Sequence, residues 1–348
     1  MKRPNWRAAC CATTLIVATA GALLGGPGKY GASFLNFGIG ARALGLGGAF
    51  VAAADDGSSF YWNPAGLARI PHPELSFMYA PAFGSVAAPL ANYNHFGVVL
   101  PLPGAATLAA NYVRLAVDDI PIFPELGGEG FSQRLLDPTL RPDGVPLGYF
   151  SDREEAFVFS FAKMNTLTTS LGWLYSELAL EVPLGISFRM VRQRLFGASA
   201  SGFGVDIGAM ALLDVGKFFD LPAVGQFSSG FALIDVAGTT LSWSTHHRDR
   251  IAQDMRVGAA YSQPLPWRKS TLLFCWSKKK RPAASHHWGL EYQLSWLALR
   301  LGLDDNHLTA GAGFRFRRLT VDYGFVSSDL GNVHRLCASL VLKRKGRT

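Results

Sequence analysis

The sequence predicts an all-β protein, a transmembrane antiparallel β-barrel of about fourteen strands with an N-terminal plug segment. Three observations predict this fold. An uncharged apolar run follows basic residues at the N-terminus, apolar and polar residues alternate along most of the remaining chain, and only 17% of the 348 residues are charged. So few charges, together with a positive mean hydropathy, are unusual in a soluble secreted domain.

The N-terminus is typical of a secretory signal peptide. Lys2, Arg3 and Arg7 precede an apolar run over residues 8–24, with small-residue pairs that suit cleavage. We therefore expect residues 1–26 to be removed, although the cleavage site stays open. An uncleaved membrane anchor is the alternative, but this run lies at the short end of the roughly 17–25 residues that span a bilayer.

The residue content argues against several other classes of protein. Removing the three basic residues of the signal peptide leaves 30 Lys and Arg against 25 Asp and Glu. The mature chain is then only mildly basic, and we expect no nucleic-acid binding. Cys275 and Cys337 would be the remaining cysteines, which are too few for a disulfide scaffold.

No motif in the chain predicts an enzyme, a cofactor or a metal site. There is no G-x-S-x-G nucleophile motif, zinc-binding helix or phosphate-binding loop, and the glycines near residue 47 lack a surrounding βαβ unit. The pairs His246/His247 and His286/His287 have no Asp, Glu or Cys at ligand-like spacing. We expect these histidines to lie in solvated outer loops.

Alternation is clearest near the C-terminus. Between residues 307 and 317, Leu308, Phe314 and Phe316 share one face, and Arg315 and Arg317 share the other. Because successive side chains of a strand point to opposite faces, the segment has one apolar and one polar wall. The polar face is rich in glycine and mixed charge, which suits a wide lumen with lipid outside. A soluble β-sandwich is the alternative.

Similar segments recur along the chain, and an even number of them would return both ends of a barrel to the periplasmic side. We expect the barrel over residues 73–343, followed by a basic tail over residues 344–348. The connections 165–181 and 213–226 are long for periplasmic turns, and either could hold a short helix. The fourteen predicted strands begin near Glu74, Asn94, Thr107, Glu155, Leu184, Phe203, Ser229, Asp254, Thr271, His287, Ala298, His307, Leu319 and His334.

Residues 27–72 are the candidate plug, or hatch. Side chains fill a barrel of roughly eight strands, and sixteen or more leave an open channel, so a fourteen-stranded lumen needs an occupant. Within this stretch, Asp55 and Asp56 precede a Gly-Ser-Ser sequence and predict a turn or helix N-cap. In the triplet Asn63-Pro64-Ala65, the proline favours an extended Asn63 and ends the preceding aromatic run.

The order of these features resembles the FadL/TodX-like outer-membrane transporters, and most closely their compact PorV/PorQ-like branch. The resemblance rests on GARALGLGGAFVAAADDGSSFYWNPAGLA at residues 40–68, and on LTAGAGFRF, LTVDYGF and DLGNVHRL near the C-terminus. It implies a plugged barrel in the outer membrane, in contact with membrane lipid. One departure is that the chain runs on from Leu342 into basic residues, where such barrels commonly end on an aromatic residue.

The resemblance implies two functions. In the first, the barrel passes hydrophobic compounds, such as long-chain fatty acids, across the outer membrane. Arg315 and Arg317 are then the candidates for binding a ligand carboxylate on the inner face. The candidate lining residues, which could instead merely anchor the plug, are Phe60, Tyr61, Trp62, Phe123 and Phe131.

In the second function, implied by the PorV-like branch, the barrel is a docking or shuttle component that receives secretion-system proteins. A purely structural barrel is a third possibility. The sequence favours transport over docking by a narrow margin, because it has no large insertion in the later outer loops to hold a partner.

Overall fold

The computed structural model describes residues 32–84, 88–123, 132–133, 146–171, 176–221, 223–265, 269–281, 283–327 and 332–342. The expected signal peptide, the start of the 27–72 segment, Phe131 and the basic tail 344–348 lie outside these residues. Among the described residues, no helix is long and apolar enough to cross a membrane.

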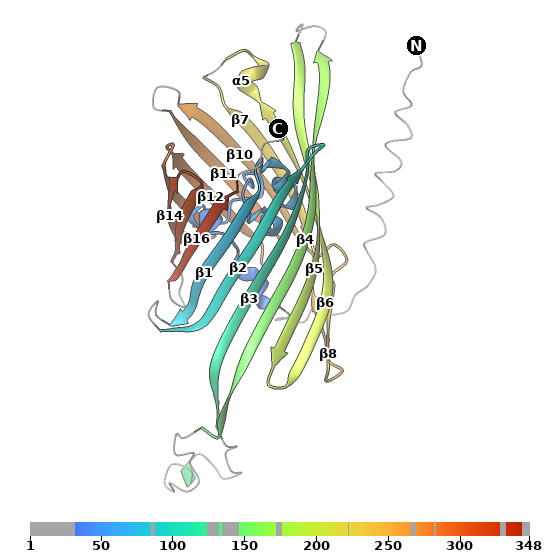
Figure 1. The fold of residues 1–348 in the computed structure, drawn as a ribbon, viewed down its shortest axis with the longest axis vertical. Helices are drawn as coiled ribbons and strands as arrows, with labels where there is room; N and C mark the ends of the chain where they lie inside the picture. Colours follow the sequence, from blue (N-terminus) through green and yellow to red (C-terminus); the bar gives the residue numbers. More distant parts are fainter. Residues whose placement is uncertain are drawn as a thin grey trace, which may run out of the picture.

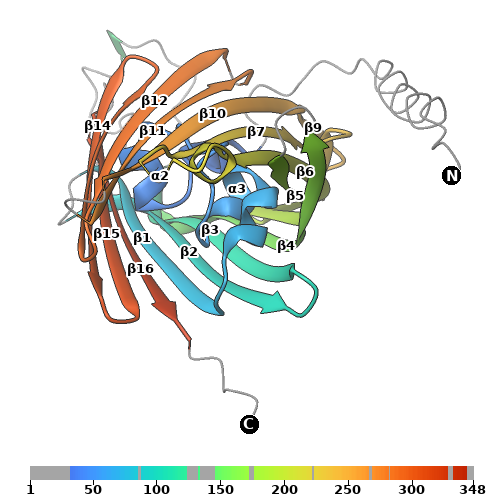
Figure 2. The same cartoon turned by 90° about the horizontal axis from the view of Figure 1, so that it is seen from above.

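Fourteen antiparallel strands close into a barrel, which confirms the predicted fold class and strand number (Figures 1 and 2). Closure is made where β16 pairs with β1, with Glu74 opposite Val341. The strands are β1 (Glu74–Gly84), β2 (Pro89–Leu102), β3 (Ala106–Ile122), β4 (Gly148–Leu171), β5 (Ser176–Leu195), β6 (Ala198–Asp214), β7 (Gln226–Ile234), β10 (Asp254–Leu265), β11 (Ser270–Lys279), β12 (Ser285–Gln293), β13 (Leu297–Asp304), β14 (His307–Phe316), β15 (Leu319–Val326) and β16 (Val333–Val341).

A short hairpin lies outside the ring of fourteen. It consists of β8 (Thr239–Trp243) and β9 (Arg248–Ile251), and β8 pairs with β6 next to the pairing of β6 with β7. The connection 213–226 holds α5 (Val215–Phe218), as expected. The described residues of the connection 165–181 hold no helix, because β4 and β5 run through residues 165–171 and 176–181 as paired strands.

Several strands begin earlier than predicted. β2 begins at Pro89 and not near Asn94, and β4 begins at Gly148 and not near Glu155. The physical reason is that these strands run past the apolar part of the wall, where hydrogen bonding to the neighbouring strand continues but the apolar alternation has ended.

The outward side chains of the barrel are mainly large and apolar. Phe159, Phe188 and Phe203 are 61%, 56% and 74% exposed, and Leu301 and Leu308 on the far side of the barrel are each 58% exposed. An apolar surface that continues around a closed barrel fits the hydrocarbon of a bilayer, because soluble monomers rarely expose such patches. We call these outward residues the apolar belt.

Residues 32–70, which we call the inner segment, lie inside the barrel (Figure 2). They form η1 (Ser33–Phe37), α2 (Ala41–Gly45), α3 (Ser59–Trp62) and η2 (Pro64–Arg69). Asn63 is extended, as the following proline predicts, and its side chain accepts a hydrogen bond of 3.1 Å from Ala65 N. That the inner segment acts as a plug stays a prediction.

The inner segment reaches the wall at glycines. A Cβ added to Gly302 would lie 2.3 Å from Gly47 N, and one added to Gly230 would lie 2.4 Å from Val51 O. Each of these wall glycines lies opposite another glycine on the neighbouring strand, Gly302 opposite Gly289 and Gly230 opposite Gly258. The glycine-rich inner face therefore packs against the backbone of the inner segment. Similar contacts with the inner segment are made by Gly185, Gly208, Gly258, Gly289, Gly311 and Gly324.

We expect Gly302→Ala to destabilise the protein, because the new methyl group collides with the backbone of residues 46–47. Overpacking of this kind costs about 1–3 kcal/mol. The measurement is the free energy of unfolding in urea with the protein in detergent micelles. Ala310→Val, on the outward face of the adjacent strand, is the matched control and should leave stability nearly unchanged. Equal free energies of unfolding of both variants would contradict the close contact between Gly302 and the backbone of residues 46–47.

Candidate functional site

The barrel interior has a charged side and an apolar side. Toward β1–β5, the inner segment packs in a continuous apolar cluster. Toward β5–β15, buried arginines pair with carboxylates of the wall, and contacts of Arg42 with Glu291 and of Arg256 with Tyr61 O join the inner segment to this side. The apolar cluster includes Phe34, Leu35, Ile39, Phe60, Leu67, Met78, Tyr93, Val113, Val158 and Val191.

A chain of ion pairs holds α2 against the wall. Arg42 donates to both carboxylate oxygens of Glu291 at 2.9 Å, and Glu291 also accepts from Arg300 at 2.6 Å. Arg300 reaches on to Asp322 at 2.6 Å. Glu291 is 1% exposed, so this carboxylate is compensated by two guanidinium groups in a dry site.

The two predicted aspartates have different roles. Asp55 contacts the Arg42 guanidinium and lies 3.8 Å from Arg69. Asp56 accepts hydrogen bonds from Ser58 N at 2.9 Å and Ser58 Oγ at 2.6 Å, which form the predicted turn.

Burial raises the pKa of Asp56, and the Arg42 charge offsets only part of this effect. Burial lowers the pKa of Arg42, but Asp55 and Glu291 outweigh it and raise this pKa well above its ordinary value.

Two more buried wall arginines have carboxylate partners. Arg189 lies 3.0 Å from Asp206 and 2.6 Å from Asp235. Arg256 lies 2.8 Å from Asp254 and donates to Tyr61 O at 2.8 Å. Both of these arginines are therefore compensated by carboxylates of the barrel.

Arg335 of β16 is different, because it forms no ion pair with any described residue. It is 5% exposed, donates to the carbonyl oxygens of Phe37 and Gly38, and lies 5.1 Å from the Tyr93 ring centroid. Its Nε and the Tyr93 hydroxyl have no hydrogen-bond partner among the described residues. A buried cation and a buried hydroxyl thus lie together beside the apolar cluster.

The three predicted aromatics of α3 are packed within the interior. Phe60 is 3% exposed and stacks on His95 with ring centroids 5.3 Å apart. Tyr61 donates to Leu35 O at 2.6 Å, and Trp62 donates to Ile39 O at 2.7 Å. These contacts fix the shape of the inner segment, and a role in lining a ligand path stays a prediction.

The remaining predicted path residues do not gather around α3. Phe123 follows β3 and is 48% exposed, and Phe131 lies outside the described residues. Arg315 is exposed at the end of β14. Arg317 lies in the β14–β15 turn and not on the inner wall, with its guanidinium 5.4 Å from the Phe316 ring. The turn residue has a positive φ of 54°, which ends the alternation that placed it inward.

Arg335 was missed by sequence reasoning. The alternation of Leu336 and Leu340 against Cys337 and Ser339 puts Arg335 on the inner face, and this signal could have identified it. Its lack of a carboxylate partner could not be predicted, because strand pairing alone does not show which inner-segment groups lie beside it.

His287 corrects the prediction of solvated loop histidines. It is fully buried on the inner face of β12, with Nδ1 2.8 Å from Gly47 O and 2.9 Å from Asp304 Oδ1. The reason is that β12 begins at Ser285, so His287 is already part of the wall. In the part of the chain that the structure describes, no group of three or more His, Cys, Asp or Glu residues could hold a metal ion.

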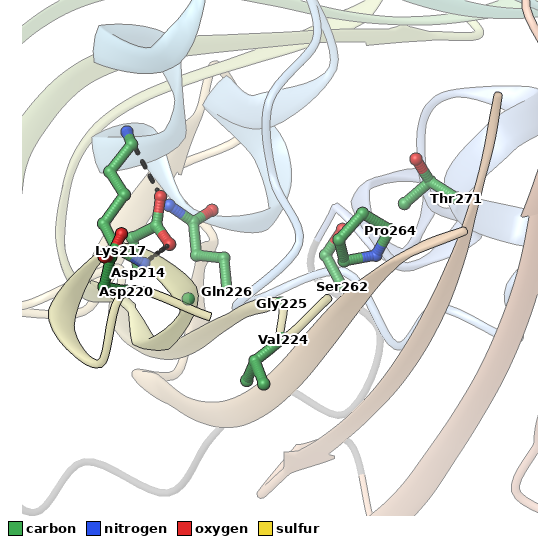
Figure 3. Close-up of a pocket in the computed structure, with 10 residues that line it drawn as sticks. Asp214, Lys217, Asp220, Val224, Gly225, Gln226, Ser262, Pro264 and Thr271 are labelled. Carbon is green, nitrogen blue, oxygen red and sulfur yellow. Dashed lines mark hydrogen bonds and ion pairs between the residues drawn. The ribbon is translucent and has the colours of Figure 1, made fainter. Parts of the chain in front are cut away.

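A polar cavity of about 490 Å³ lies at the rim beside α5 (Figure 3). Asp214 and Lys217, which pair at 3.1 Å, form one side, and Ser262 and Thr271 lie across from them (Figure 3). No predicted site residue lines this cavity. Its exposed lining has no buried charge to bind a ligand, so it is a weaker candidate than the Arg335 region.

Comparisons with known proteins connect the chain to two groups. A sequence model of the uncharacterised protein family UPF0164 matches residues 16–95. A UPF0164 protein of Treponema pallidum (strain Nichols) is 46% identical over 54 residues, which are 16% of this chain. The match spans only 14% of that relative's length.

The second group consists of solved barrels. The P. putida toluene transporter TodX has a TM-score of 0.49 at 10% identity, covering 88% of this chain and 99% of its own. CdiB from Escherichia coli has a TM-score of 0.40 at 10% identity, covering 77% of this chain and 63% of its own. At these scores the likenesses carry no functional weight. The PorV/PorQ-like branch stays a prediction.

We expect Glu291→Ala to destabilise the protein strongly, because it leaves Arg42 and Arg300 buried without their shared carboxylate. Breaking a buried pair in this way costs about 3–5 kcal/mol. Lys217→Ala, which removes the exposed ion-pair partner of Asp214, is the control and should cost less than about 1 kcal/mol. Unfolding in urea measures the free energy of unfolding of both variants. Similar losses of stability would contradict the role of Glu291 in holding α2 against the wall.

We expect Asp56→Asn and Asp55→Asn to act in opposite directions. Because burial raises the Asp56 pKa above 3.8, the folded protein loses stability as pH rises from 3.8 through the raised pKa. Asp56→Asn removes this loss, so above that window its melting temperature should exceed that of the wild type. Below pH 3.8 the two should agree. Asp55→Asn weakens the contact with Arg42 and should lower the melting temperature at pH 8. Equal lowering by both variants would contradict the assignment.

Proposed function

We propose that the protein is an outer-membrane barrel that passes hydrophobic compounds with an anionic end, such as long-chain fatty acids. The observation that carries this proposal is the buried guanidinium of Arg335, which has no carboxylate partner among the described residues and lies beside an apolar cluster. Membrane placement is supported by the apolar belt around the closed barrel.

A buried cation favours an anionic ligand. Burying an unpaired charge is costly, and a carboxylate that hydrogen-bonds with the guanidinium recovers much of that cost. Arg335 Nε and the Tyr93 hydroxyl are both free to donate, so together they could hold the two oxygens of one carboxylate.

The apolar cluster supplies the other half of the site. It runs from Phe34 and Ile39 across to Val113 and Val158 on the wall. Each methylene group of an acyl chain that leaves water for such surroundings gains about 0.8 kcal/mol. An amphiphile with a long tail and an anionic head matches this combination better than a neutral or polar solute.

Ligand entry would be coupled to movement of η1. Arg335 currently donates to the carbonyls of Phe37 and Gly38, which end η1. A carboxylate is a stronger acceptor than a carbonyl, so its binding would compete with these contacts. The ligand would thereby release the start of the inner segment from β16, which is how a plug could open.

Docking of secretion-system proteins is the second candidate. It is favoured by β3 and β4, which extend together past the neighbouring β1–β2 turn (Figure 1). A projecting, paired ribbon could contact a partner protein. A polypeptide that co-purifies with the barrel in stoichiometric amount, in place of a bound amphiphile, would favour docking.

The test is binding of oleate to the purified barrel in detergent. Tyr93→Phe removes a hydroxyl that lacks a described partner, so its melting temperature should equal that of the wild type. Its oleate binding should be several-fold weaker, because it loses roughly one charge-assisted hydrogen bond to the carboxylate. Arg335→Gln should weaken it by about tenfold or more. Oleyl alcohol should bind all forms equally.

Arg318→Gln, in an exposed turn, is the control for loss of positive charge and should leave oleate binding unchanged. Unchanged oleate binding in both Tyr93→Phe and Arg335→Gln would overturn the proposal. Because Tyr93→Phe keeps the ring, a loss of oleate binding at an unchanged melting temperature cannot be attributed to unfolding.

A further inference from the structure

The outer surface of β3–β5 carries an arginine patch at one edge of the apolar belt. It consists of Arg114, Arg153, Arg192 and Arg194, whose side chains lie on the outward face. Strand pairing brings them together in two rows. Arg114 and Arg192 both flank Glu155, and Arg153 is directly opposite Arg194.

The charges of this patch are incompletely balanced. Arg153 lies 3.8 Å from Asp118, and both groups are about half exposed. Glu155 accepts a hydrogen bond of 2.5 Å from the Tyr112 hydroxyl. Within the described residues, Arg114, Arg192 and Arg194 form no ion pair, and Arg114 Nε is buried without a partner. Two carboxylates therefore face four guanidinium groups.

Aromatic and aliphatic side chains adjoin the patch on the side toward the middle of the barrel. The row next to Arg114 and Arg192 contains Tyr112 and Phe157, and the guanidinium of Arg192 lies 5.9 Å from the Phe157 ring. Beyond this row lie Phe159, at 61% exposed, and Phe188, at 56% exposed. Cationic and apolar groups thus form one continuous surface.

We infer that the arginine patch binds the phosphate of a lipid headgroup, whose acyl chains lie on the adjoining aromatic row. Guanidinium groups bind phosphate oxygens in a bidentate manner, and weakly hydrated Arg suits this task better than Lys. The edge of the apolar belt is the depth at which headgroups of a bilayer lie. A soluble acidic partner would not require the exposed aromatics below the arginines.

This inference is independent of the interior site, because the patch faces outward and Arg335 faces inward. A lipid held here would contact β3–β5, the strands that also form part of the wall of the apolar cluster.

The test is native mass spectrometry of the full barrel titrated with dioleoyl phosphatidic acid, with dioleoylglycerol as the matched lipid without phosphate. Arg114→Gln/Arg192→Gln should weaken phosphatidic acid binding by about thirtyfold, because each of the two cations contributes about 1 kcal/mol near an anionic headgroup and about 1.4 kcal/mol is tenfold. Dioleoylglycerol binding should not change. Folding of each variant is checked by circular dichroism.

Lys163→Gln/Arg318→Gln is the matched control, since it removes two exposed charges at the opposite edge of the barrel. It should leave phosphatidic acid binding unchanged. Equal weakening by both variants would show non-specific charge attraction and overturn the inference, as would no weakening in Arg114→Gln/Arg192→Gln. Displacement of the lipid by inorganic phosphate at equal concentration would overturn a lipid site in favour of free phosphate. If Arg114→Gln/Arg192→Gln lost a co-purified protein but still bound phosphatidic acid, the patch would bind a protein partner, and the inference would be overturned.

Discussion

The whole interior depends on the close approach of one backbone to another. The inner segment passes the wall at separations that leave no room for a Cβ, as between Gly47 and Gly302 or between Val51 and Gly230. Close-packed interiors tolerate little added volume, so these glycines decide where the segment can lie. The strands can then curve around the segment as a closed barrel, with large side chains left to the outer surface.

Ion pairs complete this arrangement on one side only. Glu291, between Arg42 and Arg300, connects α2 to the wall, and Arg189 and Arg256 have acidic partners of their own. The opposite side is apolar and contains Arg335, which has only carbonyl oxygens as acceptors. The inner segment is therefore held by ion pairs at one side and by weaker carbonyl acceptors at the other.

The same physical rule connects the interior and exterior arginines. In both places guanidinium groups without a full complement of carboxylates adjoin apolar side chains, at Arg335 inside and at Arg114 and Arg192 outside. That combination favours amphiphiles with an anionic head. The interior group lies in a dry site, where an unpaired charge is costly, while the exterior group is partly solvated and its charges are screened.

Local patterns in the sequence determined the barrel, its fourteen strands and the turn at Asn63, because side-chain alternation and proline geometry are set by near neighbours. Strand starts such as Pro89 were missed, since pairing extends past the apolar alternation. Only the tertiary structure decided that His287 is buried, that Arg317 lies in a turn and that Arg335 has no acidic partner among the described residues. These facts depend on which distant segments meet inside the barrel, and no local pattern in the chain records that.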